Sequence, residues 1–415
     1  MTTLRLEAID LRNFVRAADW LAVGVAVSLP WSTSATAILI VLWLLAVLPT
    51  LDYDSVRREL ATAAGGLPVL LWLLAAAGML WADVSWSERF AGFGGFNRLL
   101  LIPLLLAHFR RSDHGAAVLY GFAVSVACLL VVSYVTLAVP ALQNPAKIPG
   151  VPVKDYVLQS EIFLICAVAL AGIAVDLWRA NKTGLAAALV VLAAAFIANI
   201  GFVITSRTVV VVAPFLIAML GWRAAGPKGV IAAVLIGAAI AGALWLSSSR
   251  LRDRAAASLG DIRAYVASSD SNSTSQHLNF LKVSAGIVAS APLIGHGTGD
   301  IAEQFRRTAA DRSGVDSVVT VNPHNQFFAV AIQLGLVGGA VLVAMWLAHL
   351  LLFHGASLAA WAGALVVVQN IVACLFNSHL FDFSQGWLYV FGVGVAGGMV
   401  LRERDAASAP EAAAP

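Results

Sequence analysis

The chain has 415 residues, of which 60% are hydrophobic and 12% are charged, and its formal net charge is +3. Soluble domains are roughly 45–50% apolar and about 25% charged, so this composition excludes an ordinary soluble protein and indicates many membrane spans. The small net charge gives no reason to expect a broad polyanion-binding surface. The three cysteines lie in apolar stretches without disulfide or metal-ligand spacing, so we expect neither a disulfide nor a metal site there.

Apolar stretches of membrane-spanning length recur along the chain, since a bilayer core takes about 20 apolar residues per helix. They predict an all-α polytopic membrane protein of about 12 transmembrane helices. In chain order the stretches cover residues 14–31, 34–51, 66–82, 96–109, 114–139, 157–177, 183–205, 207–225, 228–247, 325–350, 356–375 and 383–401.

Basic residues gather on alternate connections between these stretches, and the positive-inside rule therefore predicts that both termini face the cytoplasm. We expect transmembrane helices in 1–247 and 325–401, one large outer loop in 248–324 and a disordered cytoplasmic tail in 402–415. The basic residues on the cytoplasmic side are Arg5, Arg12, Arg16, Arg57, Arg58, Arg110, Arg111, Arg179, Lys182, Arg223, Lys228, Arg402 and Arg404.

The loop 248–324 is the one long connection, and its composition predicts helices over 258–267 and 277–290. The following run, 291–299, is rich in turn residues. We interpret its Gly295-His296-Gly297-Thr298-Gly299 segment as a tight turn that positions the loop. A phosphate cradle is the alternative, although the lysine and serine or threonine that follow such a loop are missing.

The run Asn322-Pro323-His324-Asn325-Gln326 lies where this loop re-enters the membrane. A histidine at such a boundary titrates near neutrality and can exchange protons with a substrate. Proline suits the first turn of a helix, so we expect His324 on the opening turn of the next span. The alternative is an interfacial histidine with only a structural role. Further along this span, Gly335 and Gly338 have the spacing of residues that permit close helix packing.

Arg207 follows Ser206 between two apolar stretches with almost no loop. An arginine near the membrane interior is costly unless it is paired or functional. Its guanidinium can hold a phosphate through two hydrogen bonds. The alternative is an arginine that reaches out to lipid headgroups.

Other polar residues on the outer side are weaker candidates for substrate contact. Asp382 can orient a histidine, bind sugar hydroxyls or simply begin a helix. Arg263, Lys282 and Arg306 of the loop can face a polyanionic substrate or pair with the loop's own acids. The acidic residues show no paired ligand motif, so we expect no metal site and no cofactor.

These motifs together resemble the O-antigen ligase family of bacterial envelope enzymes. That family shows a histidine, a polar residue, nine further residues and a Gly-x-x-Gly motif, which here are His324-Asn325 and Gly335-Leu336-Val337-Gly338. The segment Pro292–Gly299 and the pair Ser206-Arg207 resemble further family signatures. The chain departs from the family at Asn279, where many relatives have an arginine.

The resemblance implies a membrane glycosyltransferase similar to the GT-C class, in the inner membrane of a Gram-negative bacterium. It implies undecaprenyl-pyrophosphate-linked O-antigen as the donor and a sugar hydroxyl of lipid A–core as the acceptor. It also implies contact with membrane lipids and no nucleic-acid partner. His324 is the expected base and Arg207 the expected cation at the leaving pyrophosphate. Asn325, Arg263, Lys282, Arg306 and Asp382 are the expected substrate-binding residues.

Three alternatives stay open at this stage. An O-antigen polymerase uses the same donor with a second lipid-linked glycan as acceptor, and a protein O-oligosaccharyltransferase uses a protein acceptor. A transporter is more distant, because that class places ionisable groups at mid-membrane, where Glu161 is the one plausible candidate here.

Overall fold

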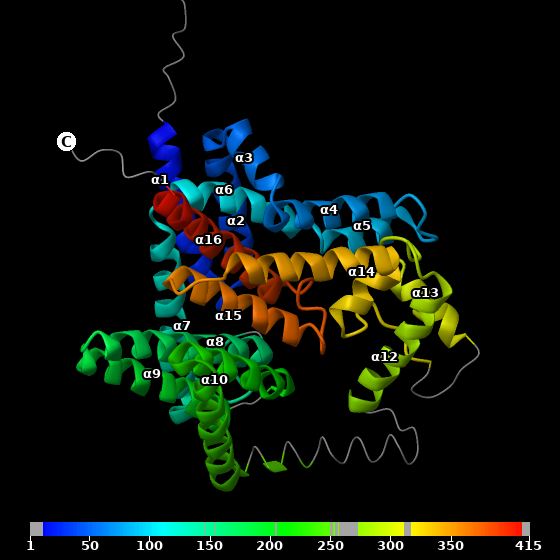
Figure 1. The fold of residues 1–415 in the computed structure, drawn as a ribbon. Coiled ribbons are helices and arrows are strands. Elements are labelled where there is room, and N and C mark those ends of the chain that lie inside the picture. The colour runs from blue at the N-terminus through cyan, green and yellow to red at the C-terminus, as the bar shows by residue number, and fades with distance from the viewer. Residues whose placement is uncertain are drawn as a thin grey trace, which may run out of the picture.

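The computed structural model describes residues 11–408 except 146, 154, 204–205, 250–251, 254–255, 257–272 and 311–316, and every regular element in that part is a helix (Figure 1). In chain order the elements are α1 Leu11–Ser28, α2 Thr33–Val47, η1 Leu48–Thr50, α3 Tyr53–Leu60, α4 Ala63–Gly78, α5 Trp86–Gly94, η2 Asn97–Leu100, α6 Leu101–Arg111, α7 Gly115–Ala138, η3 Pro140–Leu142, α8 Tyr156–Arg179, α9 Thr183–Phe202, α10 Arg207–Ser247, α12 Ser273–Ser290, α13 Ile301–Ala309, α14 Gln326–Leu352, α15 Leu358–Ala373 and α16 Phe383–Ser408.

Each apolar stretch predicted from the sequence overlaps a helix in the described residues, so the protein is a multi-pass membrane protein that is all-α in its described part. In the described part, seven helices are long and apolar enough to cross a bilayer, or up to nine if the bent pairs α3–α4 and α5–α6 each form one span. The number of about 12 spans therefore stays a prediction. α10 contains two predicted stretches, which meet at a break in helical geometry at Ala225 and Gly226.

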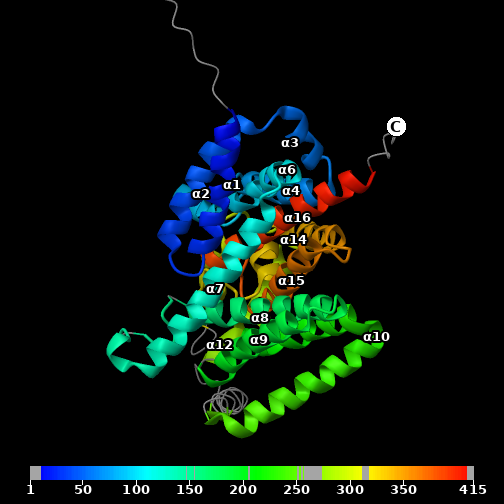
Figure 2. The same ribbon diagram turned by 90° about the vertical axis from the view of Figure 1, so that its left-hand side faces the viewer.

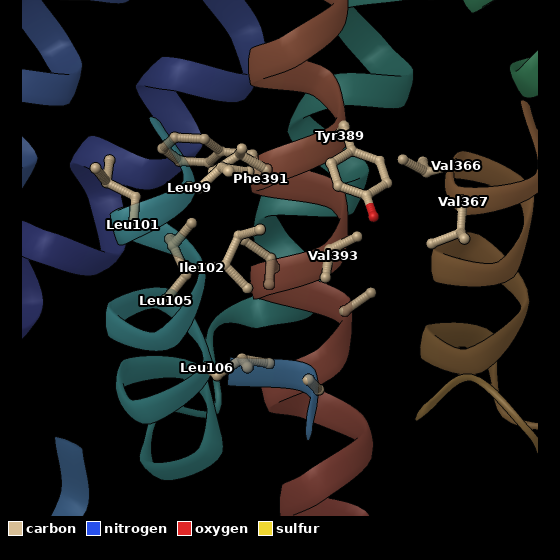
Figure 3. Packing of buried hydrophobic residues seen from close by; sticks show 14 of the residues in the cluster. Leu99, Leu101, Ile102, Leu105, Leu106, Val366, Val367, Tyr389, Phe391 and Val393 are labelled. Carbon is tan, nitrogen blue, oxygen red and sulfur yellow. The ribbon is translucent and has the colours of Figure 1, made fainter. Parts of the chain in front are cut away.

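The core of the molecule lies around α16, which packs between α6 and α15 (Figure 3). Tyr389 and Val393 of α16 are fully buried against Leu105 of α6 and Val367 of α15. Lipid tails are as apolar as the helices, so helix association in a bilayer depends on close van der Waals packing. Small residues permit this packing because they let two helix backbones approach each other. A Cβ atom at Gly394 would lie 2.4 Å from the Cβ of Leu105, so α6 approaches α16 through this glycine.

A second group of helices, α8, α9 and α10, lies beside this core (Figure 2). α8 is buried along most of its length against α9, α10 and α15, and its first turns contribute the buried polar residues Gln159, Ser160 and Glu161. The start of α8 thus brings polar groups close to the connection between α15 and α16.

The basic connections gather at one end of the bundle. Arg110 bonds Glu59 and Asp405, and Arg404 donates to the carbonyl of Leu352. α12 and α13 lie at the opposite end (Figure 1). The charge separation on which the orientation was predicted is therefore present in the fold, while the assignment of the two ends to cytoplasm and periplasm stays a prediction.

The outer loop is partly helical in its described residues. The predicted helix over 277–290 is confirmed within α12, and the predicted helix over 258–267 lies outside the described residues. The division of the chain into the segments 1–247, 248–324, 325–401 and 402–415 stays a prediction.

Candidate active site

His324 lies just before α14 and not on its first turn, so the sequence prediction was wrong on this point. Asn325 caps the helix, because its Oδ1 accepts a hydrogen bond from the backbone N–H of Phe328 at 3.1 Å. His324 precedes this cap with a φ of 53°, in the left-handed region that non-glycine residues seldom adopt. Residues held in such conformations cluster at functional sites.

Asn325 is occupied by the backbone around it. Its Nδ2 donates to the carbonyl of Leu375 at 3.1 Å while its Oδ1 caps α14, and the residue is 9% exposed. Its fixed place supports the start of the helix and the 374–382 connection. Substrate contact by Asn325 remains a prediction that these bonds do not favour.

A hydrogen-bond chain fixes the side chain of His324. The backbone N–H of His324 donates to Oδ1 of Asn322 at 2.9 Å, so the Nδ2 of Asn322 is the donor to Oδ1 of Asn377 at 2.8 Å. Nδ2 of Asn377 in turn donates to Oδ2 of Asp382 at 2.9 Å. Oδ1 of Asn377 is therefore an acceptor, and the Nδ1 of His324, 3.1 Å away, must carry the proton. The lone pair of the neutral imidazole is left on Nε2.

Aromatic rings enclose the half-buried imidazole of His324. The Phe280 ring stacks on it with a centroid distance of 5.7 Å and an interplanar angle of 12°. Burial lowers the pKa of His324 below its ordinary value of 6.5, although the Asn377 hydrogen bond and the Asp382 charge act in the opposite direction. The imidazole is therefore neutral at pH 7 and can accept a proton.

His277 of α12 is a site residue that the sequence reasoning missed. Its ring centroid lies 4.3 Å from that of His324. Burial lowers the pKa of His277 to about 4, and the charges of His324 and Arg207 act in the same direction. His277 is thus neutral at pH 7. The one sequence signal was its place beside Asn279, in the run where relatives of the family carry an arginine.

Arg207 begins α10 on the same side of the molecule, and its charge acts on His277. Ser206 caps this helix by accepting from the backbone N–H of Val209 at 3.2 Å. The guanidinium is exposed. The structure therefore places a cation close enough to His277 for its charge to act on that ring. Contact of Arg207 with an anionic substrate stays a prediction.

The remaining predicted binding residues have different surroundings. Asp382 belongs to the His324 network, and Lys282 is exposed on α12. Arg306 pairs with Glu303 of α13, which favours the alternative of an internally paired loop surface for this residue. Arg263 lies outside the described residues. The substrate contacts of all four stay predictions.

The glycine-rich segment after α12 inserts into a break in α14. Gly335 has a φ of 64°, and a Cβ there would lie 2.2 Å from the carbonyl oxygen of Leu293. The freed backbone groups pair across the break, with His296 donating to the Ile332 carbonyl at 2.9 Å and Leu336 donating to that of Pro292 at 2.7 Å. Gly335 thus makes room for a loop, and the packing of helix on helix expected for it was wrong.

This segment is a tight turn and not a phosphate cradle. A cradle offers free backbone N–H groups to the anion. Here the N–H groups of Gly295, His296, Gly297, Thr298 and Gly299 all donate within the protein. The turn also anchors the loop on α4, since the Thr298 hydroxyl donates to the carbonyl of Ala75 at 2.6 Å.

A polar cavity of about 470 Å³ adjoins the His324 network. Asn377 and Asp382 form part of its wall, with Asp155 and Gln385 beside them. Among the residues that the structure describes, no group of three or more His, Cys, Asp or Glu side chains is placed to hold a metal ion. The chemistry that this arrangement offers is proton transfer at Nε2 of His324 next to a cationic group.

The comparison with known families agrees with the motifs. Residues 192–343 match the family model described as O-antigen ligase. No curated protein matches the chain. The matched region contains Arg207, His277 and His324, and members of the family are membrane glycosyltransferase-like enzymes. Residues 192–343 of the chain are therefore similar to the O-antigen ligase family.

Proposed function

We propose that the protein transfers O-antigen from undecaprenyl pyrophosphate to a sugar hydroxyl of lipid A–core. The observation that carries this proposal is the state of His324: its Nδ1 proton is held by Asn377, its Nε2 is left basic, and Arg207 supplies positive charge nearby. A base and a cation suit a sugar donor that is already activated by its pyrophosphate leaving group.

The transfer is a single displacement. Nε2 of His324 accepts the proton of the acceptor hydroxyl as the oxygen attacks the anomeric carbon of the donor sugar. The bond from this carbon to the pyrophosphate oxygen breaks, and the electron pair leaves with undecaprenyl pyrophosphate. Arg207 offsets the charge that develops there. One displacement inverts the anomeric centre, and no step uses a metal or a cofactor.

The apolar surroundings support a lipid-linked substrate. A cavity of about 310 Å³ with an almost wholly apolar lining lies between α7, α8, α15 and α16, and it shares Leu29 with the polar cavity beside Asp382. A polyprenyl chain in the first cavity would bring its head group towards the second. The basic connections at the opposite end support a site that faces the periplasm and termini that face the cytoplasm, in the inner membrane of a Gram-negative cell.

The test is an in vitro transfer assay with purified protein, undecaprenyl-pyrophosphate-linked O-antigen and lipid A–core, with and without a chelator. We expect laddered lipopolysaccharide that persists under chelation, and a loss of about 10²–10⁴-fold in rate for His324→Ala. A longer lipid-linked glycan without lipopolysaccharide would identify a polymerase instead. Neither product, with both substrates shown to be intact, would contradict transfer to lipid A–core and direct attention to a protein acceptor or to transport.

A further inference from the structure

A buried ion pair connects α8 with the 374–382 connection. Glu161 is 0% exposed and His379 is 1% exposed, and Nε2 of His379 lies 3.2 Å from Oε1 of Glu161. On the other side of the same ring, Nδ1 lies 3.2 Å from Oδ2 of Asp382. Burial alone lowers the pKa of His379, but the two carboxylates outweigh this effect and raise it to about 10. His379 is therefore an imidazolium at neutral pH.

Stability does not explain why this pair is present. Buried ion pairs are often no more stabilising than apolar residues of similar volume, because both charges lose their hydration. Removing one partner is costly, since it leaves a buried charge without compensation. The pair is therefore weak evidence for a stabilising role, and its contacts with the neighbouring polar groups bear on its use.

The geometry leads directly to His324. Asp382 is shared, since its Oδ2 contacts His379 and also accepts from Nδ2 of Asn377 at 2.9 Å. Arg98 holds the backbone of this connection, because its guanidinium donates to the carbonyls of Phe381, at 3.0 Å, and Asp382. With the backbone held, the contact with His379 and the hydrogen bond from Asn377 together fix the place of the Asp382 carboxylate.

The orientation of Asn377 depends on Asp382 in turn. While the carboxylate accepts from Nδ2, Oδ1 of Asn377 faces the Nδ1 of His324. If Asp382 turns away or takes up a proton, the Asn377 amide loses one of the two bonds that orient it, and only the bond from Nδ2 of Asn322, at 2.8 Å, still opposes its turning over. Its Nδ2 would then face His324 and select the tautomer with the proton on Nε2, which cannot act as a base.

We propose that Glu161 and His379 form a positioning unit for His324, in which the buried pair holds Asp382, Asp382 orients the Asn377 amide, and this orientation keeps Nε2 of His324 free to accept a proton. The inference rests on the proposed function for its view of His324 as a base. It assigns no contact with substrate to Glu161 or His379.

The test uses Glu161→Gln, His379→Gln and the double variant. His379→Gln leaves Glu161 as a buried charge without compensation, and Glu161→Gln removes one of the two carboxylates that balance His379. For each single change we expect a lower thermal midpoint together with a loss of about 10- to 100-fold in kcat, while the KM values for donor and acceptor stay within about twofold. The double variant replaces the pair by two neutral amides. We expect it to recover the thermal midpoint but not kcat.

A merely structural pair gives a different result, because kcat would then recover with the thermal midpoint in the double variant, and this would overturn the proposal. The matched control is His349→Gln. His349 is fully buried and bonds the hydroxyl of Tyr389 and the carbonyl of Ala64, remote from the His324 network. We expect this change to lower the thermal midpoint without a specific loss of kcat per folded molecule.

A second readout does not depend on turnover. Diethyl pyrocarbonate modifies the unprotonated nitrogen of an imidazole, and mass spectrometry measures the rate at His324. In the other tautomer the unprotonated nitrogen is Nδ1, which faces Asn377 and is shielded by it. At pH 7 we therefore expect modification of His324 to slow about tenfold in the double variant and to stay unchanged in His349→Gln. Equal rates in all proteins would overturn the positioning unit. If wild type transfers no glycan but the modification rate still falls, the proposed function fails while the positioning unit stands.

Discussion

Replacing Asn377 by leucine tests the tautomer argument most directly. Leucine has a shape close to that of asparagine but neither accepts from His324 nor donates to Asp382. In the wild type, Oδ1 of Asn377 accepts from Asn322 and faces Nδ1 of His324, at 2.8 and 3.1 Å. We therefore expect Asn377→Leu to remove the preference for the tautomer that leaves Nε2 unprotonated.

The size of the effect follows from the bonds that are lost. An unsatisfied buried polar group costs about 1–3 kcal/mol, and this range bounds the bias that Asn377 imposes on the two tautomers. Since about 1.4 kcal/mol corresponds to a factor of ten in rate, we expect kcat to fall roughly 5- to 150-fold. Because Asn377 also lines the cavity next to the His324 network, the KM values for donor and acceptor are measured alongside kcat.

The assay is initial-rate glycan transfer at saturating donor and acceptor, with the amount of folded protein checked by size-exclusion chromatography. The control is Asn370→Leu, which makes the same change at a residue of α15 that is 2% exposed and bonds Cys374. A kcat for Asn377→Leu equal to that of the control would refute the reasoning that Asn377 sets the tautomer of His324.

Further predictions concern the cation, the pH profile and the helix break. Arg207→Gln should lower kcat about 10²-fold. Arg207→Lys should have a kcat between those of the wild type and Arg207→Gln, because lysine keeps the charge but cannot hold a phosphate through two hydrogen bonds. Equal rates for all three proteins in the transfer assay would contradict a role of Arg207 at the leaving pyrophosphate. Burial lowers the pKa of His324 below 6.5, so kcat/KM should rise with pH to half its maximum below pH 6.5 and level off towards pH 8; a half-maximal point above pH 7 would contradict a neutral base. Gly335→Ala should cost about 1–3 kcal/mol of stability or more, because its φ is positive and its Cβ would meet the backbone of Leu293. Gly286→Ala, whose Cβ would face open space inside α12, should not lower the thermal midpoint and should raise it slightly through helix propensity.

The helices were predictable from the sequence because the rule that identifies them is local. A bilayer core sets the length of an apolar stretch, and each predicted stretch contains its own evidence. The break at Gly335 was not predictable in this way. Its backbone conformation is explained by the loop at Leu293, which lies more than 40 residues earlier in the chain and packs on it only in the folded protein.

The site was predictable only in part. His324, Arg207 and Asp382 were identified from motifs and membrane position, and the structure brings their surroundings together. The contacts that set the state of His324 join residues 161, 277, 324 and 377–382, and no spacing in one sequence indicates that these segments meet. Glu161 was singled out only as a possible transport residue, whereas the fold gives it an ion pair with His379.

The distribution of charge among the histidines argues for a base rather than for an electrostatic clamp. Burial keeps His324 and His277 neutral at pH 7, so neither of them supplies the positive charge that a pyrophosphate requires. That charge has to come from another group, and Arg207 is the cation whose charge acts on His277. The charged histidine is His379, buried where no substrate reaches it and balanced by two carboxylates. If the histidines at the substrate served as cations, His324 and His277 would be protonated at pH 7. Their neutral state instead suits a base that accepts a proton next to an anionic leaving group.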